Sequence, residues 1–109
     1  MNFIKATQTS ELTPGNKLKV TVEDKVLLLT NIGDVYYAID NKCPHMGGSL
    51  ADGKLEGENI VCPKHGSVFS VKTGKFVSPG KLLFMKVHTH DTNSYPVKVE
   101  GTDILVGIE

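Results

Sequence analysis

Apolar and polar residues follow the two-residue period of β-strands over much of the chain. They alternate over residues 17–22 and 97–100, which is the pattern of a strand with one buried face. The apolar run at residues 26–29 indicates a strand buried on both faces, and shorter strands are expected at 35–39 and 104–106. No segment shows a convincing helical period, so the pattern predicts a chain built mainly of strands.

Turn residues separate these segments at short intervals. Glu23-Asp24, Asn31-Ile32-Gly33-Asp34 and Gly101-Thr102 each lie between two predicted strands. Short strands joined by frequent turns are typical of barrels and sandwiches. The fold class that we predict is therefore all-β, with a barrel or sandwich as the base of the molecule.

Length and charge restrict the class of protein further. The 109 residues include 12 basic and 12 acidic side chains, which fits one domain over residues 1–109 without net charge. A nucleic-acid-binding surface would need a basic patch, and a membrane-spanning helix would need about 20 apolar residues in a row. The first residues also lack the pattern of a secretion signal. We therefore expect a soluble, cytoplasmic domain that binds neither nucleic acid nor membrane.

The segment from about residue 41 to residue 80 differs from the strands around it. It is rich in glycine and contains both cysteines and two of the four histidines of the chain. The order is Cys43-Pro44-His45, sixteen further residues, and then Cys62-Pro63-Lys64-His65. We interpret the segment as a specialised insertion that a β scaffold carries.

Two thiolates and two imidazoles form a four-ligand set that zinc, copper or an iron–sulfur cluster accepts. Structural zinc sites usually pair ligands that lie two to four residues apart. Only one residue separates Cys43 from His45, so the two side chains reach one tetrahedral ion with difficulty. In a two-iron cluster, each loop can instead offer its cysteine to one iron and its histidine to the other. Zinc at the same ligands, or buried thiols beside hydrogen-bonded histidines, remain as alternatives.

Glycine and proline flank both pairs of ligands. Gly47, Gly48 and Gly66 carry no side chain, so nearby backbone amides can approach the sulfur atoms of a buried, negatively charged cluster. Pro44 and Pro63 fix the backbone beside each cysteine. Both features predict loops that hold their ligands in place before the metal binds.

At these residues the sequence resembles the Rieske family. The first box of the resemblance is Cys43-Pro44-His45-Met46-Gly47-Gly48, and the second is Cys62-Pro63-Lys64-His65-Gly66-Ser67. Ser78-Pro79-Gly80 is similar to the proline loop that covers the cluster in that family. Matches outside the boxes extend the resemblance over nearly the whole chain.

The resemblance implies a fold, a cofactor and a set of ligands. The fold would be a β base domain with a small cluster-binding subdomain inserted at about residues 41–80. The cofactor would be one 2Fe–2S cluster, with Cys43 and Cys62 on one iron and His45 and His65 on the other. Ser67 resembles the serine that donates a hydrogen bond to a cluster sulfur.

Three departures from the respiratory members of the family indicate which branch of the family the sequence resembles. Those proteins have a disulfide between the two loops where this chain has Gly48 and Lys64, and a tyrosine where it has Phe69. They also carry a membrane anchor. The resemblance therefore points to a low-potential Rieske ferredoxin, an electron carrier and not an enzyme, between an NAD(P)H-dependent flavoprotein reductase and a terminal oxygenase. The small subunit of an assimilatory nitrite reductase is the alternative.

Other candidate residues have simpler interpretations. His88 and His90 have strand spacing and could bind a metal, but solvent-facing histidines fit the same pattern. Met46 could contact a partner or fill a gap, and Lys64 and Lys81 could attract an acidic partner or lie in solvent. We predict no catalytic residue, because the histidines of both boxes already serve as ligands.

Overall fold

The computed structural model describes residues 1–44, 47–64, 66–79 and 90–109. Within them the chain forms strands and two short 3₁₀ helices, η1 and η2. In chain order these elements are β1 (Asn2–Gln8), η1 (Thr9–Glu11), β2 (Lys17–Val22), β3 (Lys25–Ile32), β4 (Val35–Asp40), η2 (Leu50–Asp52), β5 (Lys54–Glu56), β6 (Asn59–Val61), β7 (Val68–Ser70), β8 (Phe76–Ser78), β9 (Ser94–Tyr95), β10 (Val97–Glu100) and β11 (Asp103–Ile108).

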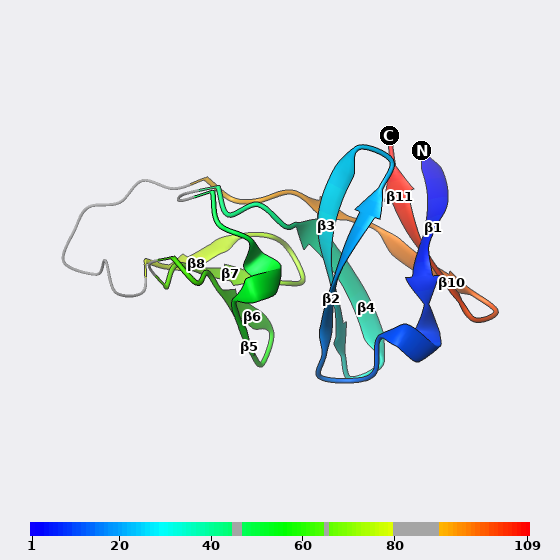
Figure 1. Cartoon of the computed structure of the whole chain (residues 1–109), viewed down its shortest axis with the longest axis horizontal. Helices are drawn as coiled ribbons and strands as arrows, with labels where there is room; N and C mark the ends of the chain where they lie inside the picture. Colours follow the sequence, from blue (N-terminus) through cyan, green and yellow to red (C-terminus); the bar gives the residue numbers. More distant parts are fainter. Residues whose placement is uncertain (45–46, 65, 80–89) are drawn as a thin grey trace.

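The strands form three antiparallel sheets, and the all-β prediction is confirmed. One sheet has the order β1-β11-β10 and the second has the order β2-β3-β4-β9. These two sheets bring the N- and C-terminal segments together in a base (Figure 1). The third sheet, β5-β6-β7-β8, lies beside the base and is built entirely from the glycine-rich middle of the chain. In the described residues no helix is long and apolar enough to cross a membrane.

The core of the base lies between its two sheets. Leu27 and Leu29 of β3 point into it and are fully buried. From the other sheet, Ile104 and Val106 of β11 pack against the same cluster. The alternation that predicted β2 therefore corresponds to Val20 and Val22, which enter this core. In β10 only Val97 packs against the core, and the expectation of a buried face was wrong for Val99, which is exposed.

The opposite face of β3 contributes to a second core. Leu28 of β3 and Ile39 of β4 are fully buried there, together with Leu50 of η2 and Ile60 of β6. Because Leu27, Leu28 and Leu29 are all buried, the prediction of a strand covered on both faces is confirmed for these three residues, whereas Val26, the first residue of the predicted run, is exposed. This strand joins the base to the sheet of the middle segment.

The turn that we predicted over Asn31-Ile32-Gly33-Asp34 is shorter in the structure, and the prediction was wrong for its first two residues. Asn31 and Ile32 end β3, and only Gly33 and Asp34 form the turn, with φ of 60° and 71°. Positive φ at both central residues is the geometry that two-residue hairpins favour. Asn31 stays in the strand because its buried amide donates to the Leu12 carbonyl at 2.9 Å and accepts from the Asp34 N–H at 2.8 Å.

Candidate metal centre

Cys43 lies in a loop that follows β4 directly. Its N–H donates to the Gly48 carbonyl at 2.7 Å, and its carbonyl accepts the Gly47 N–H at 2.8 Å. Gly47 has a φ of 70°, a left-handed conformation that costs glycine little and other residues more. These two backbone bonds close the loop on itself and hold the cysteine near its start.

Cys62 lies in a second loop, between β6 and β7. Its N–H donates to the Ser67 carbonyl at 2.7 Å, and its carbonyl accepts the Gly66 N–H at 3.0 Å. Gly66 has a φ of 80°. Val61 and Val68 form the last pair of the β6–β7 ladder, so the loop begins and ends on paired strands.

The two cysteine loops have the same pattern of backbone hydrogen bonds. In each loop the cysteine N–H bonds to the carbonyl five residues later, and the N–H four residues later bonds to the cysteine carbonyl. In each loop a glycine with positive φ occupies that fourth position. The sequence allows this match because Cys43 and Gly47 have the same spacing as Cys62 and Gly66. Gly47 and Gly66 thus close the loops with their own amides, a role that the sequence analysis did not assign to them.

The first loop is anchored by Asn41, a residue that the sequence analysis did not single out. Its side chain donates to Ser49 Oγ at 2.9 Å and accepts the Ala51 N–H at 2.8 Å, while its carbonyl accepts the Leu50 N–H at 2.8 Å. Asn41 is buried, so these bonds satisfy its polar groups and join the start of the loop to its end. An Asn directly after a strand and before a glycine-rich loop was the signal for such a clamp.

Asp40, the last residue of β4, ties the start of this loop to the segment after residue 90. One carboxylate oxygen accepts a hydrogen bond from the Tyr95 hydroxyl at 2.6 Å, and the other accepts from the Asn93 amide at 2.9 Å. Burial and the neighbouring Asp40 carboxylate both raise the pKa of Tyr95 well above its usual value. The start of the cysteine loop is therefore fixed by the base.

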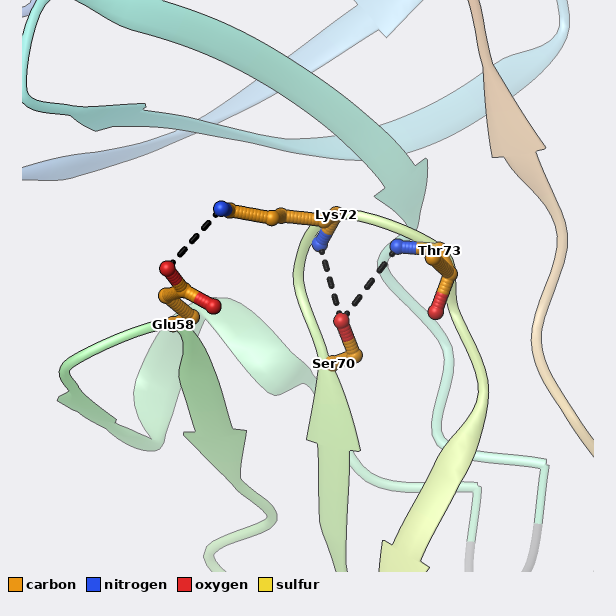
Figure 2. Close-up of polar contacts among 4 residues, drawn as sticks. All are labelled: Glu58, Ser70, Lys72 and Thr73. Carbon is orange, nitrogen blue, oxygen red and sulfur yellow. Dashed lines mark hydrogen bonds and ion pairs between the residues drawn. The ribbon is translucent and has the colours of Figure 1, made fainter.

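The second loop is supported by the turn that follows β7 (Figure 2). Ser70 Oγ accepts from the N–H groups of Lys72 and Thr73, at 3.2 and 3.4 Å. Lys72 Nζ lies 2.8 Å from a carboxylate oxygen of Glu58, which raises the pKa of the lysine. The Val71 N–H also donates to the Glu58 carbonyl at 2.9 Å. These contacts join the two ends of the β6–β7 hairpin that carries Cys62.

Both cysteines reach the same apolar core. Cys43 and Cys62 are buried, neither forms a disulfide, and both pack in the cluster that contains Leu50, Ile60 and Phe69. Metal ligands in such a core are shielded from water, and a bound metal would offset the charge of their thiolates. The predicted convergence of the two cysteine loops is therefore seen in the structure.

Gly48 lies where the two loops touch. A Cβ atom built on Gly48 would lie 2.8 Å from Lys64 Cγ and 3.4 Å from Cys62 Sγ. Residues 48 and 64, the positions of the disulfide in respiratory relatives, are therefore neighbours in space. At this point the stem of a lysine packs on a glycine.

Ser67 and Phe69 complete the described surroundings of Cys62. Both are fully buried. The ring of Phe69 meets that of Phe76 edge to face, with 5.8 Å between the ring centroids. Phe69 thus supplies apolar packing at the position where respiratory relatives place a tyrosine hydroxyl.

The remaining sequence candidates have mixed outcomes. His45, His65, Met46, Lys81 and His88 lie outside the described residues. His90 and Lys64 are exposed. The described part of the predicted ligand set is therefore its cysteine half.

The chemistry of the two cysteines, Cys43 and Cys62, fits an iron–sulfur centre. Two buried thiols in matched loops supply the soft ligands that iron–sulfur clusters take. Gly48 leaves room beside one of the sulfur atoms, where any side chain at that position would be crowded. An all-β base that carries two such cysteine loops fits the class of small iron–sulfur proteins.

Comparisons with known proteins give the family. The model of the Rieske 2Fe-2S domain matches residues 2–82. The chain is 37% identical to the ferredoxin component of the naphthalene 1,2-dioxygenase system of Pseudomonas putida, over 99% of this chain and 97% of the relative. The chain belongs to the Rieske 2Fe-2S domain family, and its cofactor is a 2Fe–2S cluster.

Solved structures agree with this assignment. The ferredoxin of carbazole 1,9a-dioxygenase from Nocardioides aromaticivorans IC177 superposes with a TM-score of 0.86 at 28% identity, and all of both chains is covered. A chain from the complex of reduced oxygenase and oxidized ferredoxin in carbazole 1,9a-dioxygenase gives 0.81 at 30% identity, over 95% of this chain and 91% of that one. The predicted resemblance, its fold and its cofactor are confirmed.

Proposed function

We propose that the chain is a Rieske ferredoxin whose cluster is held by Cys43 and Cys62 on one iron and by His45 and His65 on the other. The matched hydrogen bonding of the two cysteine loops is the observation that supports this ligand set most directly. A pair of equivalent loops offers equivalent ligands, and the cysteine of each loop already lies in one shared core. Each histidine follows its cysteine at close spacing, so the same loops would also supply the second iron.

The chain is an electron carrier and does not itself catalyse a reaction on a substrate. When bound, the cluster supplies one reversible oxidation and reduction at iron. The chain's own residues bind it in a dry apolar core and separate its sulfur atoms from water. A buried centre of this kind exchanges electrons with a partner through the rim of its loops and needs no substrate pocket.

The partners follow from the relatives. The chain is similar over nearly its full length to a dioxygenase ferredoxin component, and to a ferredoxin chain described in complex with its oxygenase. The acceptor would be a terminal oxygenase, and the donor an NAD(P)H-dependent flavoprotein reductase. These relatives favour the oxygenase over the nitrite reductase that the sequence left as an alternative.

The remaining proposals concern organisation and location. Residues 1–109 would form a single domain, with the cluster-binding insertion at about residues 41–80. The third sheet, β5-β6-β7-β8, lies within that segment and shares its core with β3 and β4, which supports an insertion in place of a second domain. We place the protein in the cytoplasm, where NAD(P)H-dependent reductases work.

A titration of the purified protein tests the carrier function. Chemical reductant should reduce the visible chromophore reversibly by one electron, and an NADH-dependent flavoprotein reductase should reduce it catalytically. Addition of a terminal oxygenase and its substrate should then reoxidise it. The Cys43→Ser variant is the control and should show no chromophore to reduce. Substrate turnover by the isolated chain, or the lack of any reversible reduction, would overturn the proposal.

A further inference from the structure

Lys64 lies across the junction of the two cysteine loops. Its Cγ and Cε atoms would lie 2.8 and 3.6 Å from a Cβ atom on Gly48, and that same point is 3.4 Å from Cys62 Sγ. The aliphatic stem of the lysine therefore covers Gly48 at the side of the loop that faces the sulfur. The ammonium group is bonded to this Cε atom, so Lys64 brings a positive charge to the junction at which Cys62 Sγ lies.

In the part of the chain that the structure describes, charged groups of both signs lie around this sulfur. Cys62 and Lys64 line a hollow of about 360 Å³ together with Asp52 and Lys54. Lys54 Nζ lies 3.5 Å from a carboxylate oxygen of Glu56, so the negative charge of Glu56 partly offsets the positive charge of Lys54. Lys64 differs from Lys54 because its stem also packs on Gly48, so its position relative to the sulfur is fixed by contact.

We infer that Lys64 sets the reduction potential of the cluster in two opposing ways, through its charge and through its stem. The inference rests on the proposed ligand set, in which Cys62 is an iron ligand. Reduction adds one electron at iron and so one negative charge to the cluster, while no bond of Lys64 changes. The lysine is thus a positioning residue of the centre and not a ligand.

The two effects have opposite signs. A nearby positive charge stabilises the more negative, reduced cluster, so the ammonium raises the potential. The apolar stem occupies space beside Cys62 Sγ that water would otherwise fill. Water there would also stabilise the reduced cluster, so the stem would lower the potential. Two variants separate the two effects. Lys64→Met keeps an apolar stem and removes the charge, whereas Lys64→Ala removes both the stem and the charge.

Voltammetry of the cluster-loaded protein tests the inference. Lys64→Met should lower the equilibrium constant for reduction about threefold to tenfold, which equals about 30 to 60 mV for one electron. Lys64→Arg should stay near wild type, and Lys64→Ala should lie above Lys64→Met. The Lys64→Met shift should also shrink at high salt, because the lysine is exposed. Lys54→Met is the matched control and should shift the potential by less than half as much.

Two results would overturn the inference. One is a Lys64→Met potential equal to wild type, and the other is an equal shift in Lys54→Met, which would assign the effect to net charge. A second test does not depend on removing the lysine. Gly48→Ala should displace the stem and change the potential, and the change should shrink in a Lys64→Ala background, where only the contact of the new methyl group with Cys62 Sγ remains. Additive shifts in that double variant would contradict a contact between the two residues.

The outcome is separable from that of the proposed function. Iron and sulfide analysis of the wild-type protein tests the cluster itself. Wild-type protein with an intact 2Fe–2S cluster, and with a potential that Lys64→Met leaves unchanged, would remove the role of Lys64 and leave the proposed function standing.

Discussion

Replacing Gly47 by alanine tests whether the closed form of the cysteine loop holds the cluster. Gly47 has a φ of 70°, and its N–H closes the loop on the Cys43 carbonyl at 2.8 Å. A Cβ atom there would meet only Lys42 Cε at 3.8 Å, which is an ordinary contact. The substitution therefore adds backbone strain without a steric clash.

The magnitude follows from the left-handed backbone. An L-residue in this conformation costs about 1–2 kcal/mol relative to glycine. If that strain acts on the closed loop, the equilibrium between the cluster-holding loop and its open form shifts by a factor of about 5 to 30. Loss of the cluster to an iron chelator, followed by visible absorbance, should be faster by the same factor.

Gly101→Ala is the matched control for this prediction. Gly101 has a φ of 62° in the turn between β10 and β11, and a Cβ atom there would meet nothing within 4 Å. Both variants should lower the midpoint of thermal unfolding, because both carry the same kind of strain. Only Gly47→Ala should release the cluster faster. Equal rates of cluster loss in the two variants would refute the reasoning about the loop.

Three further predictions concern the surroundings of the site. Phe69→Ala should lower the free energy of unfolding by about 3–5 kcal/mol in urea titrations, because it empties the buried contact with Phe76. Ser67→Ala should lower the midpoint potential by roughly 45 mV in voltammetry, if its buried hydroxyl is worth about 1 kcal/mol more to the reduced cluster. Tyr95→Phe should cost about 1.5 kcal/mol at neutral pH, since it removes the bond to Asp40. Wild-type protein should lose that stability above about pH 10, the pKa of an unfolded tyrosine, because the folded pKa is raised and the unfolded chain releases the proton first. Unfolding curves of Tyr95→Phe should lack this alkaline loss.

Strands with a strong pattern were predictable from the sequence. The alternating residues 17–22 became β2, and the apolar run at residues 26–29 lies within β3. The short strands β5 to β8 were not predicted, because three residues are too few to show a period. Their pairing depends on contacts within the glycine-rich segment, such as Ile60 opposite Phe69, which no local pattern reveals.

The candidate site was predictable where its chemistry is local. Cys43 and Cys62 stood out by residue type and spacing, and the structure brings both into one core. The role of Asn41 was not predicted, since its partners lie on the far side of a loop eight to ten residues away. The resemblance implied that residues 48 and 64 lie close together, but the packing of the Lys64 stem on Gly48 is seen only in the structure.

Mössbauer spectroscopy of the oxidised protein, enriched in iron-57, tests the central claim most directly. The account gives the two irons different ligands: Cys43 and Cys62 on one, His45 and His65 on the other. The spectrum should therefore contain two distinct ferric sites in equal amounts. A single type of iron site, or purified protein that contains zinc and no sulfide, would contradict the account.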